Sequence, residues 1–192
     1  SFYPAGPGDS SSVSDDNVLA WVEGRLGLKR TLAAWTWVDA SLGDSVKLTL
    51  LCPSASWAQE ARTEAKSLGI GESVESVGFD EEPDVAGLYR RARVLLHAGD
   101  ASTPQIFRWA LASGVPLAAE SSAAAAAVVR AAAYLVPPSD TRALGAAVLT
   151  LLVEDSVAET LRERGLERAQ AYDARRAVGR RLRCRLFYRL AD

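Results

Sequence analysis

Cysteine, histidine and long apolar runs are scarce in this sequence of 192 residues, and each scarcity argues against a class of protein. The two cysteines, Cys52 and Cys184, lie far apart, form no CxxC motif and have no neighbouring histidine, so neither a zinc site nor a disulfide framework is expected. No run of about 18 apolar residues is present to span a bilayer. The first residues lack the basic start and apolar centre of a signal peptide, so we expect a cytoplasmic protein.

Two nucleotide-binding motifs are missing as well. No GxGxxG follows Glu23, which argues against a dehydrogenase that binds a dinucleotide. No P-loop lysine motif occurs either. Any phosphate-binding site must therefore be built from other residues.

Charge is unevenly distributed, although the formal net charge is only −2. Residues 161–192 contain 10 arginines and four acidic residues, which leaves the rest of the chain acidic. A basic segment of this kind can bind phosphates or anionic lipid, which predicts a peripheral contact of the C-terminal helix with an anionic membrane. The alternative is a solvated, arginine-rich helix face.

The chain divides into a short lead-in and one domain. Residues 1–16 are rich in Gly, Pro, Ser and Asp and have no apolar period, so they are predicted to be a flexible lead-in or linker. Residues 17–192 have the length and the apolar content of a single domain with a sizeable core.

Strand and helix patterns alternate along this domain. Strands are predicted at 17–23, 46–51, 76–79, 93–97, 115–119 and 134–136, and helices at 29–42, 54–68, 84–89, 104–113, 122–131, 140–153, 156–170 and 172–190. Right-handed crossovers then give a doubly wound, Rossmann-like α/β fold with a mostly parallel six-stranded sheet of order 3-2-1-4-5-6.

The segment 89–116 has the layout of strand, loop, helix and Gly stop that builds a ligand crevice in such a sheet. Its loop offers the hydroxyls of Ser102 and Thr103 next to the free backbone N–H groups of a helix N-terminus, which predicts a phosphate cradle. Pro104 fits the first helical position. A capped helix start without a ligand is the alternative.

His97 is the only histidine and stands at the end of the fourth predicted strand, where such sheets place functional residues. It is a candidate for ligand contact or, alternatively, a hydrogen-bonded structural histidine with no carboxylate near it in the sequence. Trp109 can belong to the core or to the ligand site. The other tryptophans are expected in the core and in helix packing: Trp21, Trp35, Trp37 and Trp57.

Several segments, in this order, resemble the C-terminal half of family 4 glycosyltransferases of the GT-B fold. The matching segments are 24–30 (Gly-Arg-Leu-Gly-Leu-Lys-Arg), 77–82, 88–92, 114–116 (Gly-Val-Pro), 134–140 and 161–169. In that family this half binds a nucleotide-sugar donor, such as a UDP- or GDP-sugar, and an N-terminal domain binds the acceptor. The resemblance therefore implies donor binding here and an acceptor domain in cis or in trans.

The resemblance also implies roles for the cations after the first strand. Arg25 and Lys29 would neutralise the donor diphosphate without a metal, with Arg30 as the alternative to Lys29 because the family has one more residue between the two cations. A surface helix with no ligand is the other interpretation of these residues. The family implies a retaining transferase, and we expect the chain to be inactive without the acceptor domain.

The sequence departs from the family at its Glu-x7-Glu motif, which falls on Ala101 and Trp109. A shift of one residue would offer Asp100 but would place Arg108 at the ribose. Neither Ala101 nor Trp109 can accept a hydrogen bond from a sugar hydroxyl. Gln105 and Glu120 are polar candidates to compensate, or else they are solvent-exposed. A non-catalytic module that retains the fold for binding or assembly is therefore the alternative function.

Overall fold

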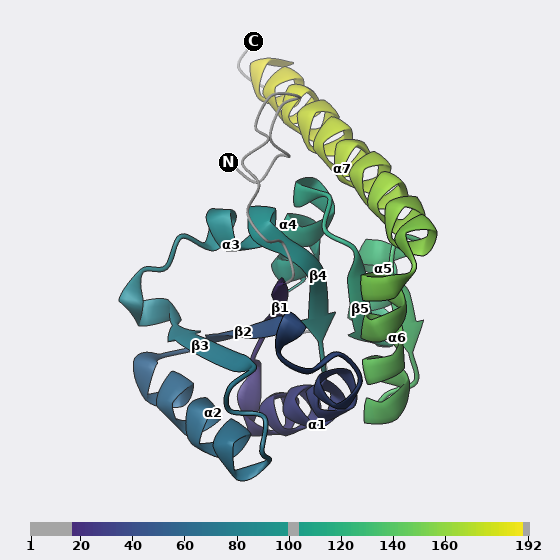
Figure 1. Ribbon diagram of the computed structural model, residues 1–192. Helices are drawn as coiled ribbons and strands as arrows, with labels where there is room; N and C mark the ends of the chain where they lie inside the picture. Colours follow the sequence, from purple (N-terminus) through teal and green to yellow (C-terminus); the bar gives the residue numbers. More distant parts are fainter. Residues whose placement is uncertain (1–16, 100–103, 190–192) are drawn as a thin grey trace.

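The computed structural model describes residues 17–99 and 104–189, and it describes the side chains of these residues except for Asp44 and residues 173–189. Six parallel strands form one sheet of order β3-β2-β1-β4-β5-β6 (Figure 1). The strands are β1 (Asn17–Trp21), β2 (Lys47–Cys52), β3 (Val74–Gly78), β4 (Ala92–His97), β5 (Leu117–Glu120) and β6 (Tyr134–Val136). This confirms the predicted doubly wound fold. The predicted lead-in at 1–16 lies outside the described residues.

Helices cover both faces of the sheet, as Figure 1 shows. One face packs against α1 (Gly24–Leu42), α2 (Ala55–Ser67) and α6 (Thr141–Val153). The other packs against α3 (Val85–Arg91), α4 (Gln105–Ser113) and α5 (Ala123–Val129). Short 3₁₀ turns occur at Gly43–Ser45 and Phe79–Glu81. Coverage on both faces explains why the central strands β1, β4 and β5 are largely apolar runs without alternation, whereas the edge strand β3 contains Glu75 and Ser76.

The helix starts follow from local capping. Ser54, Asp84 and Asp140 accept hydrogen bonds from the backbone N–H three residues on, as their sequence positions predict. Helix α1 begins at Gly24, five residues before its predicted start at 29, because Gly27 and Leu28 are already packed against the domain. Arg25 therefore lies in the first turn of a helix.

Trp35 and Tyr89 are buried polar side chains of the core that have hydrogen-bond partners. The Trp35 indole N–H donates to Ser73 Oγ at 3.0 Å, and this hydroxyl donates in turn to the Ile70 carbonyl at 3.2 Å. Tyr89 is fully buried and donates to the Ile106 carbonyl at 3.1 Å, and this burial raises the pKa of its hydroxyl. Trp37 is 46% exposed and is therefore not a core residue, but it packs against Gly145 and the Arg142 guanidinium of α6, in agreement with the prediction of helix packing.

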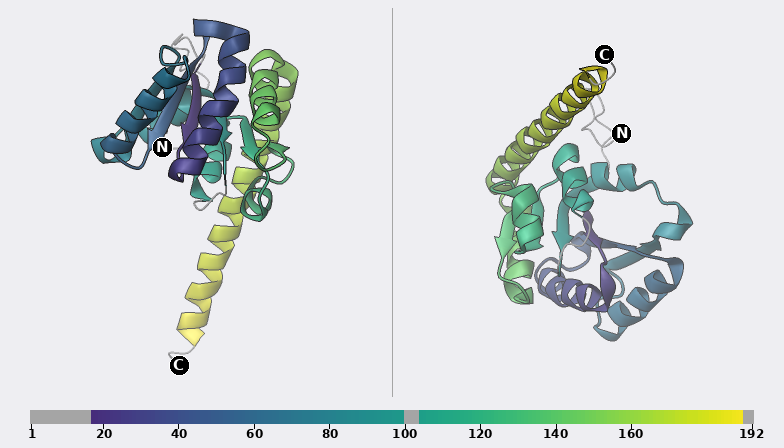
Figure 2. Two further views of the ribbon diagram at one scale, coloured as in Figure 1. Left: turned by 90° about the horizontal axis from the view of Figure 1, so that it is seen from below. Right: turned by 180° about the vertical axis from the view of Figure 1, so that it is seen from behind.

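The chain ends in one helix, α7 (Asp155–Arg189), where the sequence predicted two. The predicted break near 171 does not occur because Ala171 is a strong helix former and no Pro or Gly lies beside it. Figures 1 and 2 show α7 extending well beyond the body of the domain. None of the described helices is long and apolar enough to cross a membrane. The predicted membrane contact depends largely on side chains outside the described residues, and it stays a prediction.

Helix α7 is anchored by Arg168 and Tyr172. The Arg168 guanidinium donates to the carbonyls of Ala127 and Val128 at the end of α5, and the Tyr172 hydroxyl lies 3.2 Å from the same two carbonyl oxygens. The guanidinium also stacks over the Tyr172 ring. These bonds satisfy backbone carbonyls that a helix end leaves without intrahelical partners.

Arg130, just after α5, has a backbone conformation that favours glycine. Its φ is +50° and its ψ is −122°, whereas an L-residue with a side chain rarely adopts a positive φ. Such strain costs about 1–3 kcal/mol.

We predict that Arg130→Gly stabilises the chain by about 1 kcal/mol, because the relieved strain exceeds the about 0.5–1 kcal/mol that glycine costs in chain entropy. Urea denaturation would measure the change. Arg91→Gly is the matched control: Arg91 is also exposed but lies in regular helix, so its replacement should destabilise by about 1 kcal/mol. Equal destabilisation by both variants would contradict the assignment of strain to Arg130.

Candidate functional site

The candidate site lies at the carboxyl edge of the sheet, where β1 and β4 are neighbours. The chain passes from β1 to β2 on one side of this point and continues from β4 to β5 on the other, which makes it the topological switch point. Open α/β sheets bind ligands in the crevice that forms there. The residues that follow β1, β4, β5 and β6 therefore define the site.

Glu120 connects three of the elements around this edge. Only 2% of its side chain is exposed, and Oε2 accepts from Arg30 Nη1 at 3.0 Å and from the Gly99 N–H at 2.7 Å. Its other oxygen accepts from the Ser139 N–H at 3.0 Å. The carboxylate thus joins α1, the segment after β4 and the segment after β6. The sequence prediction of a polar residue near the crevice is right in position, and the alternative of a solvent-exposed side chain is wrong.

Helix α1 approaches the segment after β4 through a glycine. A Cβ atom on Gly27 would lie 3.2 Å from the Ala98 carbonyl oxygen, which is tighter than ordinary van der Waals contact. The missing side chain therefore lets the second turn of α1 lie directly against Ala98 and Gly99. This contact helps to fix the wall of the crevice at the switch point.

His97 and Glu23 form a pair across the switch point. His97 ends β4 and is fully buried, and its Nε2 lies 3.3 Å from Oε2 of Glu23, which follows β1 and is 14% exposed. The Phe107 ring packs edge-on against the imidazole at 5.1 Å. A buried, hydrogen-bonded histidine is compatible with the structural alternative, and its carboxylate partner is 74 residues away along the chain, at the end of the neighbouring strand. Ligand contact by His97 stays a prediction. Glu23 was missed, although a lone acidic residue between an apolar strand and a Gly-Arg turn was a usable signal.

The three cations expected at the diphosphate differ in their exposure and in their ion-pair partners. Arg25 is largely exposed, forms an ion pair of 3.1 Å with Glu60 on α2 and packs over the Trp57 ring. Lys29 is exposed, and no described residue forms an ion pair with it. Arg30 is bound to Glu120. Any role of Arg30 at a phosphate therefore falls to the N–H groups of its guanidinium that do not bind Glu120.

The helix start at α4 is only partly described. Ser102 and Thr103 lie outside the described residues, so the predicted phosphate cradle stays a prediction. Pro104 occupies the N-cap position and not the first helical position that was predicted, and Gln105, half-buried, is the first residue of α4.

Trp109 belongs to an aromatic cluster. Its ring centroid lies 5.8 Å from that of Trp21 and 6.2 Å from that of Tyr89, and Trp21 also lies 5.8 Å from the exposed Phe79. The cluster links the end of β3, the end of β1, α4 and α3. Of the two sequence interpretations of Trp109, packing against the core is the one with described contacts.

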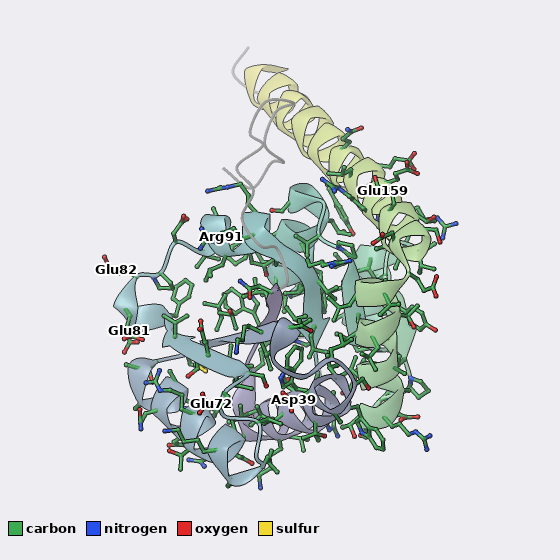
Figure 3. All side chains as sticks on the ribbon, in the orientation of Figure 1. Asp39, Glu72, Glu81, Glu82, Arg91 and Glu159 are labelled. Atoms are coloured by element: carbon green, nitrogen blue, oxygen red, sulfur yellow. The ribbon has the colours of Figure 1, made fainter. Side chains whose placement is uncertain are left out.

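The acidic turn after β3 has capping roles. Asp80 Oδ1 accepts from the Ala55 N–H at the start of α2, and Glu81 Oε2 accepts from the Gly78 N–H, each at 2.7 Å. Figure 3 places Glu81 and Glu82 at the outer rim beside β3. Among the described residues, no group of three or more His, Cys, Asp or Glu could hold a metal. The expectation that donor binding needs no metal stays a prediction.

Comparison with known proteins identifies the family. The model of the family "Glycosyl transferases group 1" matches residues 20–154, so the chain belongs to the group 1 glycosyltransferases. Comparison with curated protein sequences gave no match.

Solved structures of GT-B glycosyltransferases have the same fold. WaaG, a glycosyltransferase of lipopolysaccharide biosynthesis, superposes with a TM-score of 0.70 at 20% identity, covering 81% of this chain and 43% of WaaG. Anabaena HepE, solved with UDP and glucose, superposes with a TM-score of 0.71 at 17% identity, covering 88% of this chain and 49% of HepE. The C-terminal domain of Francisella tularensis LpcC superposes with a TM-score of 0.68 at 14% identity, covering 88% of this chain and 94% of that domain. The chain thus spans less than half the length of WaaG and HepE but nearly all of a separately solved C-terminal domain.

We predict that Glu120→Ala destabilises the chain by about 3–5 kcal/mol, because it leaves Arg30 and two backbone N–H groups without their acceptor. Glu120→Gln keeps one acceptor oxygen and should cost about 1–3 kcal/mol. Hydrogen exchange of the Gly99 and Ser139 amides, measured with urea denaturation, should accelerate in both variants. Glu154→Gln, an exposed control, should change neither quantity, and a Glu120→Ala chain as stable as this control would refute the assignment.

Proposed function

We propose that this chain is the donor-binding half of a group 1 glycosyltransferase and that it binds a nucleotide-sugar at the carboxyl edge between β1 and β4. The observation that carries the proposal is the switch point itself, where Glu23, His97 and Glu120 converge from three strands. Membership of the group 1 family supports it. HepE, which shares this fold, was solved with UDP-glucose.

The transfer reaction requires more than this chain. WaaG and HepE are about twice as long as the part this chain covers, and the separately solved LpcC domain is a C-terminal domain. An N-terminal domain, in cis or in trans, would bind the acceptor and close the other side of the crevice. We therefore expect donor binding, and no turnover, from the chain by itself.

The diphosphate would be bound by Lys29 and Arg25. Lys29 is exposed on α1, and Arg25 is held only by an exposed ion pair, which contributes about 0–1 kcal/mol and can be exchanged for a phosphate contact. Arg30 is a poorer candidate, because the buried Glu120 carboxylate already binds part of its guanidinium and balances its charge. Arg30 thus supports the shape of the site more than its affinity.

Calorimetric titration of UDP, GDP and UDP-glucose tests the proposal. The Arg25→Ala, Lys29→Ala double variant should bind the preferred nucleotide about 10- to 100-fold more weakly, because each charged hydrogen bond contributes about 1.5–3 kcal/mol and some water contact replaces it. The weakening should diminish at high salt.

A matched double variant controls for loss of charge alone. Lys66→Ala with Arg91→Ala removes one exposed Lys and one exposed Arg from other helices and should leave the affinity unchanged. If the unmodified chain binds none of the three ligands at millimolar concentration, the proposed function is wrong. If both double variants weaken binding equally, the phosphate role of Arg25 and Lys29 is wrong.

A further inference from the structure

At the switch point, the contact between Glu23 and the buried His97 is explained neither by phosphate binding nor by the Glu120 interactions. Glu23 is the residue before α1, yet its side chain does not cap that helix. The carboxylate instead lies beside the imidazole of His97, on the neighbouring strand of the crevice. Glu23, after β1, and His97, at the end of β4, thus form a polar contact between the two strands that flank the switch point.

The histidine is arranged to hold the carboxylate. Its ring is fully buried, and at Nδ1 no described residue lies within hydrogen-bonding distance. The contact between Nε2 and Glu23 Oε2 is therefore the only described hydrogen bond of the imidazole. A buried imidazole with a proton on Nε2 donates to the carboxylate and limits its rotation. His97 is thus a positioning residue for Glu23.

We infer that Glu23, oriented by His97, accepts hydrogen bonds from the hydroxyl groups of a sugar bound in the crevice. A carboxylate has about four acceptor sites, so one carboxylate can bind His97 and accept from further donors at the same time. A phosphate is the wrong ligand for Glu23, because the two negative charges repel each other. The inference rests on the proposed function and assigns to Glu23 the acceptor role that Ala101 and Trp109 cannot perform.

Two sources offer the same chemistry, the ribose of the nucleotide and the transferred sugar. Comparing UDP with 2′-deoxy-UDP isolates the ribose hydroxyl, and comparing UDP-glucose with UDP isolates the glucose. Calorimetry of the full chain would measure each ratio of affinities for the unmodified protein and for Glu23→Gln. We expect one ratio to fall by about 10-fold in Glu23→Gln, as loss of a charged hydrogen bond implies, and that ratio identifies the source. Inorganic pyrophosphate should bind equally to both proteins.

A double-mutant cycle separates positioning from a structural role. His97→Phe keeps an aromatic ring against Phe107 but removes the Nε2 donor. If His97 acts through Glu23, His97→Phe weakens sugar binding by several-fold in the unmodified chain and adds almost nothing to Glu23→Gln. A structural role would instead give additive losses and would also weaken pyrophosphate binding.

Glu64→Gln, which alters a half-buried carboxylate on α2 away from the switch point, is the control and should change neither ratio. The inference is overturned if both affinity ratios are unchanged in Glu23→Gln. It is also overturned if the losses of affinity caused by Glu23→Gln and His97→Phe are additive. Failure of the unmodified chain to bind any uridine nucleotide overturns the proposed function and this inference with it. The two failures are distinguishable because only the second abolishes UDP binding to the unmodified chain.

Discussion

The buried carboxylate of Glu120 is the interaction on which the geometry of the crevice depends. Burial of a charged carboxylate costs several kcal/mol unless hydrogen-bond donors surround it. Here a guanidinium and two backbone N–H groups do so, and each comes from a different element. Because the donors must stay in place to avoid that cost, α1 and the segments after β4 and β6 are held at fixed distances.

Fixing Gly99 has consequences along β4. The Gly99 N–H is bound to Glu120, and the preceding Ala98 carbonyl lies against Gly27 of α1. His97, one residue further back, is therefore held at the end of its strand and can keep Glu23 within reach across the switch point. The two acidic residues of the site are thus connected through three residues of backbone, although their side chains do not meet in any described contact.

The sequence was sufficient for the fold because its signals are local. Apolar runs of five or six residues, helix caps such as Ser54 and Asp84, and the stop at Gly114 each depend on neighbouring residues alone. The predicted break in α7 near residue 171 was wrong, and no Gly or Pro stands beside that position to end the helix. Strand order followed from handedness rules, which need only the alternation of strands and helices.

The site was less predictable because its contacts are long-range. Glu120 and Arg30 are 90 residues apart, and His97 and Glu23 are 74 apart. Nothing near His97 in the sequence indicates Glu23 as its partner, and nothing near Arg30 indicates that Glu120 binds it. Residue type and strand position indicated which residues lie at the carboxyl edge. Only the parallel register of β1, β4 and β5 determines which of them pair.

The aromatic cluster explains why an acceptor at position 109 would not suit this chain. Trp109 contacts Trp21 and Tyr89, and Tyr89 is fully buried. A carboxylate placed there would stand among aromatic rings in a half-buried position, where the loss of water disfavours its charge. The cluster therefore favours an apolar residue on α4, and a hydroxyl acceptor must come from another wall of the crevice. Glu23 meets that requirement because it lies just after β1 at the carboxyl edge, within hydrogen-bonding distance of His97.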